Sequence, residues 1–178
     1  MNVSINKDKL PLPFLKTGVA QIAFVVKNLH DTVEKYYRYF GIAPWHIYTY
    51  GKPLVKRMTI RGKETEYKMK VALSYFGDMR VEIIEPLEGD TLYKEFVEKH
   101  GYGVQHLGFL VDDMEEALKI AEEAGFKMIM DGSGFGLAGD GHYAYLDTED
   151  EIGITIELIE RPKRRFPPEE VYPEGVSW

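Results

Sequence analysis

The chain has 178 residues, of which 44% are hydrophobic and 29% charged, with a formal net charge of -7 and no cysteine. This length and composition predict one soluble globular unit, or two small modules that share a core. The acidic balance argues against a nucleic-acid partner, which requires a basic surface, and the lack of cysteine excludes disulfides and a thiol nucleophile. No stretch has the pattern of a secretion signal or a transmembrane span, so we expect a cytoplasmic protein with no membrane partner.

In chain order, the sequence divides into five segments: an N-terminal extension (1–16), a first module (17–88), a linking helix (89–101), a second module (102–161) and an extended, proline-rich tail (162–178). Each module has the pattern of a strand, a helix and then three strands, βαβββ. The helix of the first module is expected to begin after Asn28 and that of the second after Asp113. An Asn or Asp cap, followed here three residues later by an acidic residue, favours a helix N-terminus.

Two pairs of segments repeat each other. The stretch GVAQIAFVV from Gly18 matches GVQHLGFLV from Gly103 at a constant offset, so that Gln21 is aligned with His106. The stretch VEIIEP from Val81 resembles IELIERP from Ile156. The two modules are therefore interpreted as a duplication of one ancestral unit.

Polar residues interrupt the matched strands at four positions: Gln21, Glu82, His106 and Glu157. Taken alone, His106 would be explained as a core histidine with one hydrogen bond, and each glutamate as a residue on the solvent side of its strand. A buried carboxylate is costly unless it is paired or binds a metal, and two converging carboxylates repel unless a cation lies between them. If the modules pair about a pseudo-twofold axis, the four residues offer three oxygens and one imidazole nitrogen to a divalent metal.

At these four residues the sequence resembles the vicinal oxygen chelate superfamily, in which paired βαβββ modules form a cleft around a metal. The resemblance covers Gly18 to about Pro162. It implies an α+β, glyoxalase-like fold with an open mixed sheet, one divalent metal per chain (Co, Zn, Ni, Mn or Mg) and a homodimer. The ligands that it implies are Gln21, Glu82, His106 and Glu157.

The resemblance also implies an activity. The Gln/Glu/His/Glu ligand set is similar to that of glyoxalase I, whereas the amino-acid sequence around the four residues is closer to that of methylmalonyl-CoA epimerase. In that epimerase, His commonly stands at the position of Gln21 and Gln at the position of Glu82. The expected function is a metal-dependent isomerase that removes a proton next to the carbonyl of an acyl thioester or ketone, through an enolate. Epimerases of this kind use two opposed acids, here Glu157 and a residue that the register places at Glu66, with Glu64 as a rival.

Three other functions are weighed against the epimerase. A glyoxalase I-type lactoylglutathione lyase is the alternative. An extradiol-type dioxygenase is less favoured because its iron site requires two histidines and one carboxylate, and His106 is the one histidine among the four positions. A non-catalytic binding protein is disfavoured because such members of the superfamily generally lack the ligands.

Two further stretches carry expectations. GFGLAG, from Gly134 to Gly139, matches the dinucleotide fingerprint GxGxxG, but a strand pattern follows in place of a helix. We therefore predict a loop there that acts as a lid over the cleft. Residues that could line the cleft are these aromatic and histidine side chains: Trp45, His46, Tyr48, Tyr50 and His142.

Overall fold

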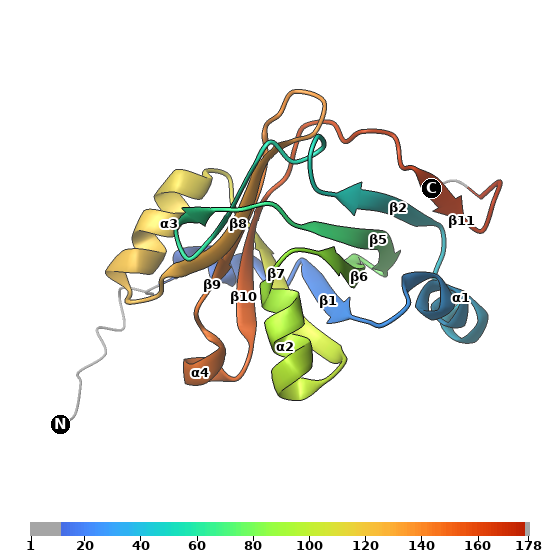
Figure 1. The fold of residues 1–178 in the computed structure, drawn as a ribbon, viewed down its shortest axis with the longest axis horizontal. Coiled ribbons are helices and arrows are strands. Elements are labelled where there is room, and N and C mark those ends of the chain that lie inside the picture. The colour runs from blue at the N-terminus through green and yellow to red at the C-terminus, as the bar shows by residue number, and fades with distance from the viewer. Residues whose placement is uncertain (1–11, 177–178) are drawn as a thin grey trace.

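The structure of the protein is a computed structural model that describes residues 12–176 (Figure 1). Residues 1–11, most of the expected N-terminal extension, lie outside the described part. The helices are η1 (Pro13–Thr17), α1 (Leu29–Phe40), α2 (Leu92–His100), α3 (Met114–Glu123) and α4 (Glu149–Ile152). The strands are β1 (Gln21–Val25), β2 (Trp45–Tyr50), β3 (Arg57–Ile60), β4 (Lys63–Glu64), β5 (Lys68–Phe76), β6 (Met79–Glu88), β7 (Gly103–Leu110), β8 (Met128–Phe135), β9 (Gly141–Leu146), β10 (Thr155–Glu160) and β11 (Glu170–Tyr172).

The strands of the described residues form one curled, mixed sheet in the order β11-β2-β5-β6-β1-β7-β10-β9-β8-β3-β4. Its centre consists of β6, β1, β7 and β10. Strand β1 is parallel to β6, and β7 is parallel to β10, while β1 and β7 are antiparallel to each other. The predicted glyoxalase-like α+β fold is confirmed.

The central pair of strands carries the pseudo-symmetry of the duplication. In the register of β1 with β7, Gln21 lies opposite Gly108 and Ala23 lies opposite His106. The sequence repeat aligns Gln21 with His106 and Ala23 with Gly108. Each pairing is therefore the twofold image of the other. The two halves meet so that matched positions are neighbours at the centre of the sheet.

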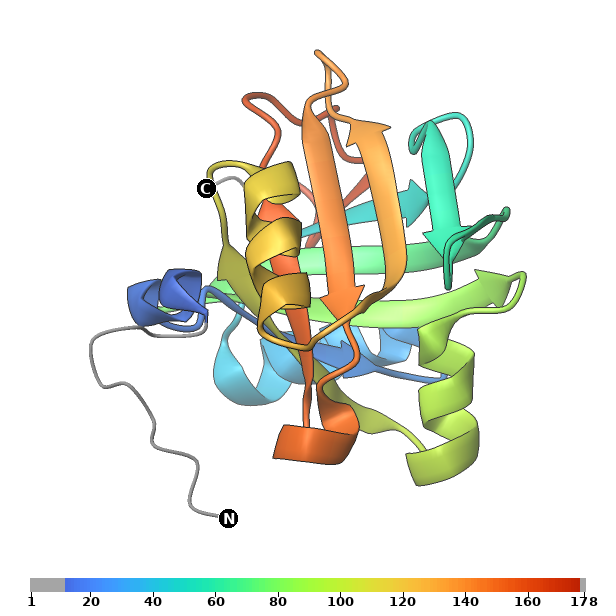
Figure 2. The same ribbon diagram turned by 90° about the vertical axis from the view of Figure 1, so that its left-hand side faces the viewer.

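Each half of the sheet has an inner and an outer face (Figure 2). Helix α1 covers the outer face of the first half, where Leu29 and Val33 pack with Trp45. Helix α3 covers the outer face of the second half in the same way. The inner faces of both halves, together with α2, share a third cluster that is rich in tyrosine. Alternation along each strand thus separates side chains that pack under a helix from side chains that face the other half.

The helix starts predicted from the cap residues are confirmed. Asn28 accepts a hydrogen bond from the Asp31 amide, and Asp113 accepts one from the Glu116 amide, both at 3.0 Å. Two glutamates at matching positions of β6 and β10 add a second contact. Glu85 accepts from the first amide of α1 at 2.8 Å and Glu160 from the first amide of α3 at 3.2 Å. A carboxylate at a helix N-terminus is favourable, so each helix is tied to its half of the sheet.

Two segments cross between the halves. The hairpin of β3 and β4, an addition to the expected three strands of the first module, pairs with β8 at the edge of the second half. The C-terminal tail returns to the first half, where β11 pairs with β2. Residues 161–169, which we call the strap, join β10 to β11 and pass from one half of the sheet to the other (Figure 1).

Candidate functional site

The four candidate ligands converge at the centre of the inner face. Each comes from a different strand: Gln21 from β1, Glu82 from β6, His106 from β7 and Glu157 from β10. The strand register explains why they meet. Ala23 lies between Glu82 and His106, and Gly108 lies between Gln21 and Glu157. Two small residues thus separate the ligands and leave room for their side chains to turn toward one another.

The distances within the cluster are those of direct contact. The Nε2 atom of His106 lies 3.1 Å from Glu157 Oε2 and 3.4 Å from Glu82 Oε2. The Gln21 amide nitrogen donates to the same two carboxylate oxygens, each at 2.9 Å, and lies 3.3 Å from His106 Nε2. One potential ligand atom from each of Glu82, His106 and Glu157 falls within a group whose members are all within 4.8 Å of one another.

The charged groups of this cluster are largely buried, which is unfavourable unless opposite charges compensate them. His106 is fully buried, and the side chains of Glu157 and Glu82 are 5% and 13% exposed. Burial alone would lower the pKa of His106, but the charges and hydrogen bonds of Glu157 and Glu82 outweigh it and raise that pKa to about 9. A proton on the imidazole therefore balances part of the carboxylate charge at neutral pH.

A residue that the sequence did not single out orients His106. The Nδ1 atom of His106 lies 2.7 Å from the side-chain oxygen of Gln105, which is itself buried. An amide oxygen can only accept, so Nδ1 carries a hydrogen and Nε2 faces the carboxylates. A partner of this kind fixes the tautomer of a metal-binding histidine. The one feature of the sequence that could have indicated this role is the position of Gln105 directly before His106.

Arg80 on β6 is a second residue that sequence reasoning missed. It is 5% exposed, and its Nε donates a hydrogen bond to the side-chain amide oxygen of Gln21 at 2.5 Å. This bond turns the Gln21 amide so that the nitrogen, not the oxygen, faces the three other ligands. Arg80 lies opposite Gln21 in the β1–β6 register, directly before VEIIEP in the sequence.

The free space beside the cluster is small. A cavity of about 20 Å³, enough for a single water molecule, is lined by Gln21, Glu82 and Glu157. Aromatic and aliphatic side chains, together with Arg80 and Arg165, form the rest of its lining. A larger cavity, of about 340 Å³, lies against α2 behind Gln105, and none of the four candidate ligands lines it. The candidate active site is therefore the smaller cavity, which the candidate ligands line.

The structure does not bring Glu66 or Glu64 to the cluster. Both are exposed, with Glu66 paired to Lys52 at 2.6 Å and Glu64 paired to Arg57 at 3.4 Å. The side chains that β5 and its approach send inward are Tyr67, Met69, Val71 and Leu73. Glu66 is out of phase with this series by one residue, and a shift of one reverses the face on which a side chain lies.

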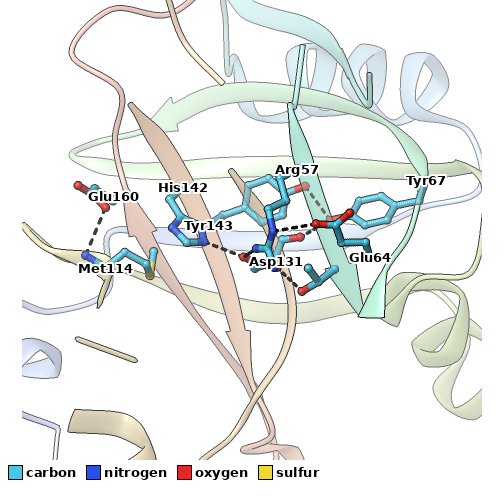
Figure 3. Close-up of polar contacts among 9 residues, drawn as sticks. Arg57, Glu64, Tyr67, Met114, Asp131, His142, Tyr143 and Glu160 are labelled. Atoms are coloured by element: carbon cyan, nitrogen blue, oxygen red, sulfur yellow. Dashed lines mark hydrogen bonds and ion pairs between the residues drawn. The ribbon is translucent and has the colours of Figure 1, made fainter. Parts of the chain in front are cut away.

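The predicted pocket residues divide between the two faces. Tyr48 and Tyr50 belong to the inner cluster, and Tyr50 lines the cavity. Trp45 instead packs on the outer face with α1. His142 also lies away from the cavity: its neighbour Tyr143 lines the cavity, while His142 contacts the buried carboxylate of Asp131 at 2.9 Å (Figure 3). The expectations for Trp45 and His142 were therefore wrong, because adjacent strand residues point to opposite faces.

GFGLAG forms the end of β8 and the turn into β9. Strand β9 follows it, so the helix N-terminus that a dinucleotide site requires is absent from this segment. Phe135 reaches the cavity, and the Leu137 amide donates to the carbonyl of Arg164 in the strap at 2.9 Å. The turn thus packs against the strap beside the cavity.

The curled sheet has two βαβββ halves, and Glu82, His106 and Glu157 form a candidate metal-binding triad at its centre. The family model described as the glyoxalase/bleomycin resistance protein/dioxygenase superfamily matches residues 20–145. The chain therefore belongs to that superfamily.

Several relatives are similar to the chain. An uncharacterised protein of Bacillus subtilis, YqjC, is 30% identical over 100 residues, which cover 55% of this chain and 71% of that protein. The crystal structure of methylmalonyl-CoA epimerase from Mycobacterium tuberculosis is 20% identical, with a TM-score of 0.58 over 82% of this chain and 88% of that one. A variant of the Streptomyces coelicolor epimerase in complex with 2-nitronate-propionyl-CoA is 19% identical, with a TM-score of 0.60 over 84% and 98%. At these identities the structures support the fold.

Among residues 12–176, no helix has the length and apolar composition needed to span a bilayer.

Gly108 gives a direct test of how tightly the cluster is packed. A Cβ added there would lie 2.6 Å from Ile159 Cδ1 and 3.0 Å from both Gln21 Cβ and Glu157 Oε2. We expect Gly108→Ala to lower the free energy of unfolding by about 1–3 kcal/mol, as overpacking does. Urea unfolding of the purified variant measures the effect.

The double variant Gly108→Ala/Ile159→Val is the control, because it removes the methyl group that the new Cβ meets first. It should recover part of the loss, although Ile159→Val alone destabilises slightly. Wild-type stability in Gly108→Ala would contradict the close packing of the four strands at this point.

Proposed function

We propose that the protein is a metal-dependent isomerase that transfers a proton at the carbon next to a carbonyl group. The observation that carries the proposal is the meeting of one buried carboxylate, one largely buried carboxylate and an oriented imidazole at one point. Two carboxylates with so little solvent are stable only with cationic neighbours. In the described structure the protonated imidazole and the Gln21 amide supply part of this compensation. A divalent cation would supply it more fully.

The residues fit such a cation. Glu82, His106 and Glu157 offer two oxygens and one nitrogen, a set that suits a borderline divalent metal such as Zn, Co, Ni or Mn, and also accommodates Mg. Gln105 already holds Nε2 of His106 toward the cluster. Gln21 would become a fourth ligand if its amide turned to present the oxygen, which requires giving up the bond from Arg80.

A divalent metal bound there would polarise a substrate carbonyl and acidify the neighbouring C–H bond. Proton transfer itself falls to the carboxylates. We propose that an oxygen of Glu157 takes the proton as the C–H electron pair moves into the enolate, and that the proton returns to the same or the adjacent carbon. Glu82 comes from the other half of the sheet and is the nearest second carboxylate.

Two reactions share this chemistry. An epimerase returns the proton to the opposite face of the same carbon, and a glyoxalase I-type lyase returns it to the adjacent carbon. The exposed position of Glu66 supports assigning both proton-transfer roles to Glu82 and Glu157, in either reaction. The epimerase reaction on an acyl thioester or ketone remains our first proposal, and the lyase remains the alternative.

One experiment tests the proposal as a whole. The purified protein is analysed for metal, loaded with each of the five candidate metals, and incubated in D₂O with small ketones, 2-oxo acids and acyl thioesters. We expect about one metal per chain and metal-dependent exchange of the hydrogen next to the carbonyl in at least one compound. Exchange that is equally fast with and without metal would contradict the proposal.

Metal affinity should depend on pH in a defined direction. Because the pKa of His106 is raised to about 9 in the metal-free protein, the imidazole carries a proton at pH 7 that a metal must displace. The apparent association constant should therefore rise about tenfold per pH unit from pH 6 to pH 9 and level off above that. Calorimetry in buffers of different ionisation enthalpy should show one proton released per metal at pH 7.

The control for this titration is Gln105→Leu, which removes the acceptor for His106 Nδ1 but none of the four candidate ligands. It should weaken metal binding about ten- to a hundredfold while the rise with pH persists. Metal affinity that is constant between pH 6 and pH 9 would show that His106 is not a ligand.

A further inference from the structure

Arg165 brings a charge from the C-terminal tail into the cavity of the metal cluster. It lies in the strap and lines the cavity with Gln21, Glu82 and Glu157. Its guanidinium donates to the hydroxyl of Tyr50 at 2.8 Å. Arg165 thus lines the same small cavity as three of the four candidate ligands.

The strap is held at both ends, which fixes the position of Arg165. On the side of the second half, Lys163 donates its amide to Asp140 at 3.2 Å, and the Arg164 carbonyl accepts from Leu137 at 2.9 Å. On the side of the first half, Glu169 accepts hydrogen bonds from the amide and the hydroxyl of Thr49, both at 2.9 Å. Arg165 therefore belongs to the architecture of the cleft.

Arg80 is the second cation of this cavity. Arg80 is buried and lines the same cavity as Arg165, so the two guanidinium groups border one small space. Among residues 12–176, no carboxylate lies within 4.0 Å of either Arg80 or Arg165. The two guanidinium groups therefore have no direct ion pair, and their charge is balanced by Glu82 and Glu157, which line the same cavity.

The charge balance shows what the cavity lacks. Arg80 and Arg165 offset Glu82 and Glu157, so a divalent metal with a neutral imidazole leaves an excess of two positive charges. The remaining polar wall is formed by Tyr50, Tyr143 and Tyr145, and burial raises the pKa of each, so these phenols stay neutral. No other acidic side chain of the described residues lines the cavity.

We propose that Arg165 and Arg80 form the anion receptor of this site, so that the substrate is a small carbonyl compound carrying a carboxylate next to its reacting carbon. This assignment rests on the proposed function and narrows its substrate class to compact oxo or hydroxy acids and their acyl relatives. Because the cavity holds only about 20 Å³, its walls must separate to admit such a substrate. Arg165 would then close on the carboxylate through charge-assisted hydrogen bonds.

The test compares carboxylates with their neutral amides, which have nearly the same shape. The probes are pyruvate and pyruvamide, lactate and lactamide, malonate and malonamide, and oxalate and oxamide, titrated by calorimetry into the metal-loaded and the chelator-treated full-length protein. We expect at least one carboxylate to bind more tightly than its amide. In Arg165→Gln this preference should fall about ten- to a hundredfold, while the metal content and the amide affinity stay unchanged.

Arg164→Gln is the matched control, because it removes the same charge from the adjacent, exposed position of the strap. It should leave the preference at the wild-type value. Arg165→Lys keeps the charge but loses the fork of donors, and it should show an intermediate preference. If Arg165→Gln does not fold, the test depends on Arg165→Lys. An unchanged preference for carboxylates over amides in Arg165→Lys would overturn the anion receptor.

The outcomes separate this inference from the proposed function. A carboxylate preference that Arg165→Gln abolishes in the chelator-treated protein as well supports the receptor even if no metal is bound. Metal-dependent exchange without any preference for carboxylates over amides overturns the receptor and leaves the proposed function standing. Equal losses in Arg165→Gln and Arg164→Gln would also overturn it, because they would reflect net charge.

Discussion

His106→Ala is expected to remove nearly all of the divalent metal that we propose for the wild-type protein. His106 supplies the only nitrogen ligand among the three residues of the central cluster, and it is fully buried against both carboxylates. Its loss leaves two carboxylates without the imidazole that contacts both of them, and two protein ligands hold a divalent ion much more weakly than three. Elemental analysis after gel filtration measures the metal per chain, and we expect close to one for wild type and close to zero for the variant.

His100→Ala is the control, because His100 is exposed and paired with Glu149 far from the cluster in the fold. It should keep full metal occupancy. His106→Gln serves as a second variant that fills more of the space, and circular dichroism must show that both variants are folded. Full occupancy in a folded His106 variant would rule out the site.

Glu157→Gln is expected to reduce exchange of the substrate hydrogen by roughly a hundredfold or more, since a neutral amide cannot take the proton. Glu66→Gln is expected to leave exchange unchanged, because the Glu66 side chain is 71% exposed and bound to Lys52 at the surface. The rates are followed by NMR in D₂O, with the compound that the wild-type protein exchanges fastest. Metal content is measured in parallel, because Glu157 is proposed as both ligand and base.

The opposite pattern would restore the first assignment. A large loss in Glu66→Gln at full metal occupancy would mean that the loop before β5 moves into the cleft when substrate binds. Unchanged exchange in Glu157→Gln with metal still bound would assign the proton transfer to Glu82 alone. Lys52→Gln tests the movement of Glu66 further, because it removes the ion pair that holds Glu66 at the surface and leaves the carboxylate unchanged.

The repeat made the centre of the molecule predictable from the sequence. A duplication fixes which positions are related by the pseudo-twofold axis, and strand periodicity fixes which of them share a face. Gln21 and His106 therefore had to be neighbours once β1 and β7 paired, and their glutamate partners followed from the parallel strands beside them. The helix caps at Asn28 and Asp113 are local sequence signals, and they predicted the starts of α1 and α3 correctly.

The second acid was not predictable because it lay where the two modules differ. The β3–β4 hairpin is an addition within the first module, and it pairs with β8 of the other half. The register through residues 66–82 placed the second acid at Glu66, which directly follows this hairpin and is one residue out of phase with the inward series of β5. A single sequence gives no signal for such a shift, since the face of a strand is set by its neighbours in space.

The fold and the superfamily of the protein were thus predictable from the sequence alone, through its repeat and the four polar residues in the repeated apolar strands. The homodimer and the cytoplasmic location stay predictions. Only the tertiary structure decided what surrounds the cluster: Gln105 behind the histidine, Arg80 against Gln21, and Arg165 from the end of the chain. Arg80 and Arg165 lie outside the aligned segments and reach the cluster from distant parts of the chain, while Gln105 lies within an aligned segment but corresponds to Ala20, so the repeat gives no signal for it. A repeat specifies the symmetric centre of a site, whereas its asymmetric wall depends on which remote segments pack against it.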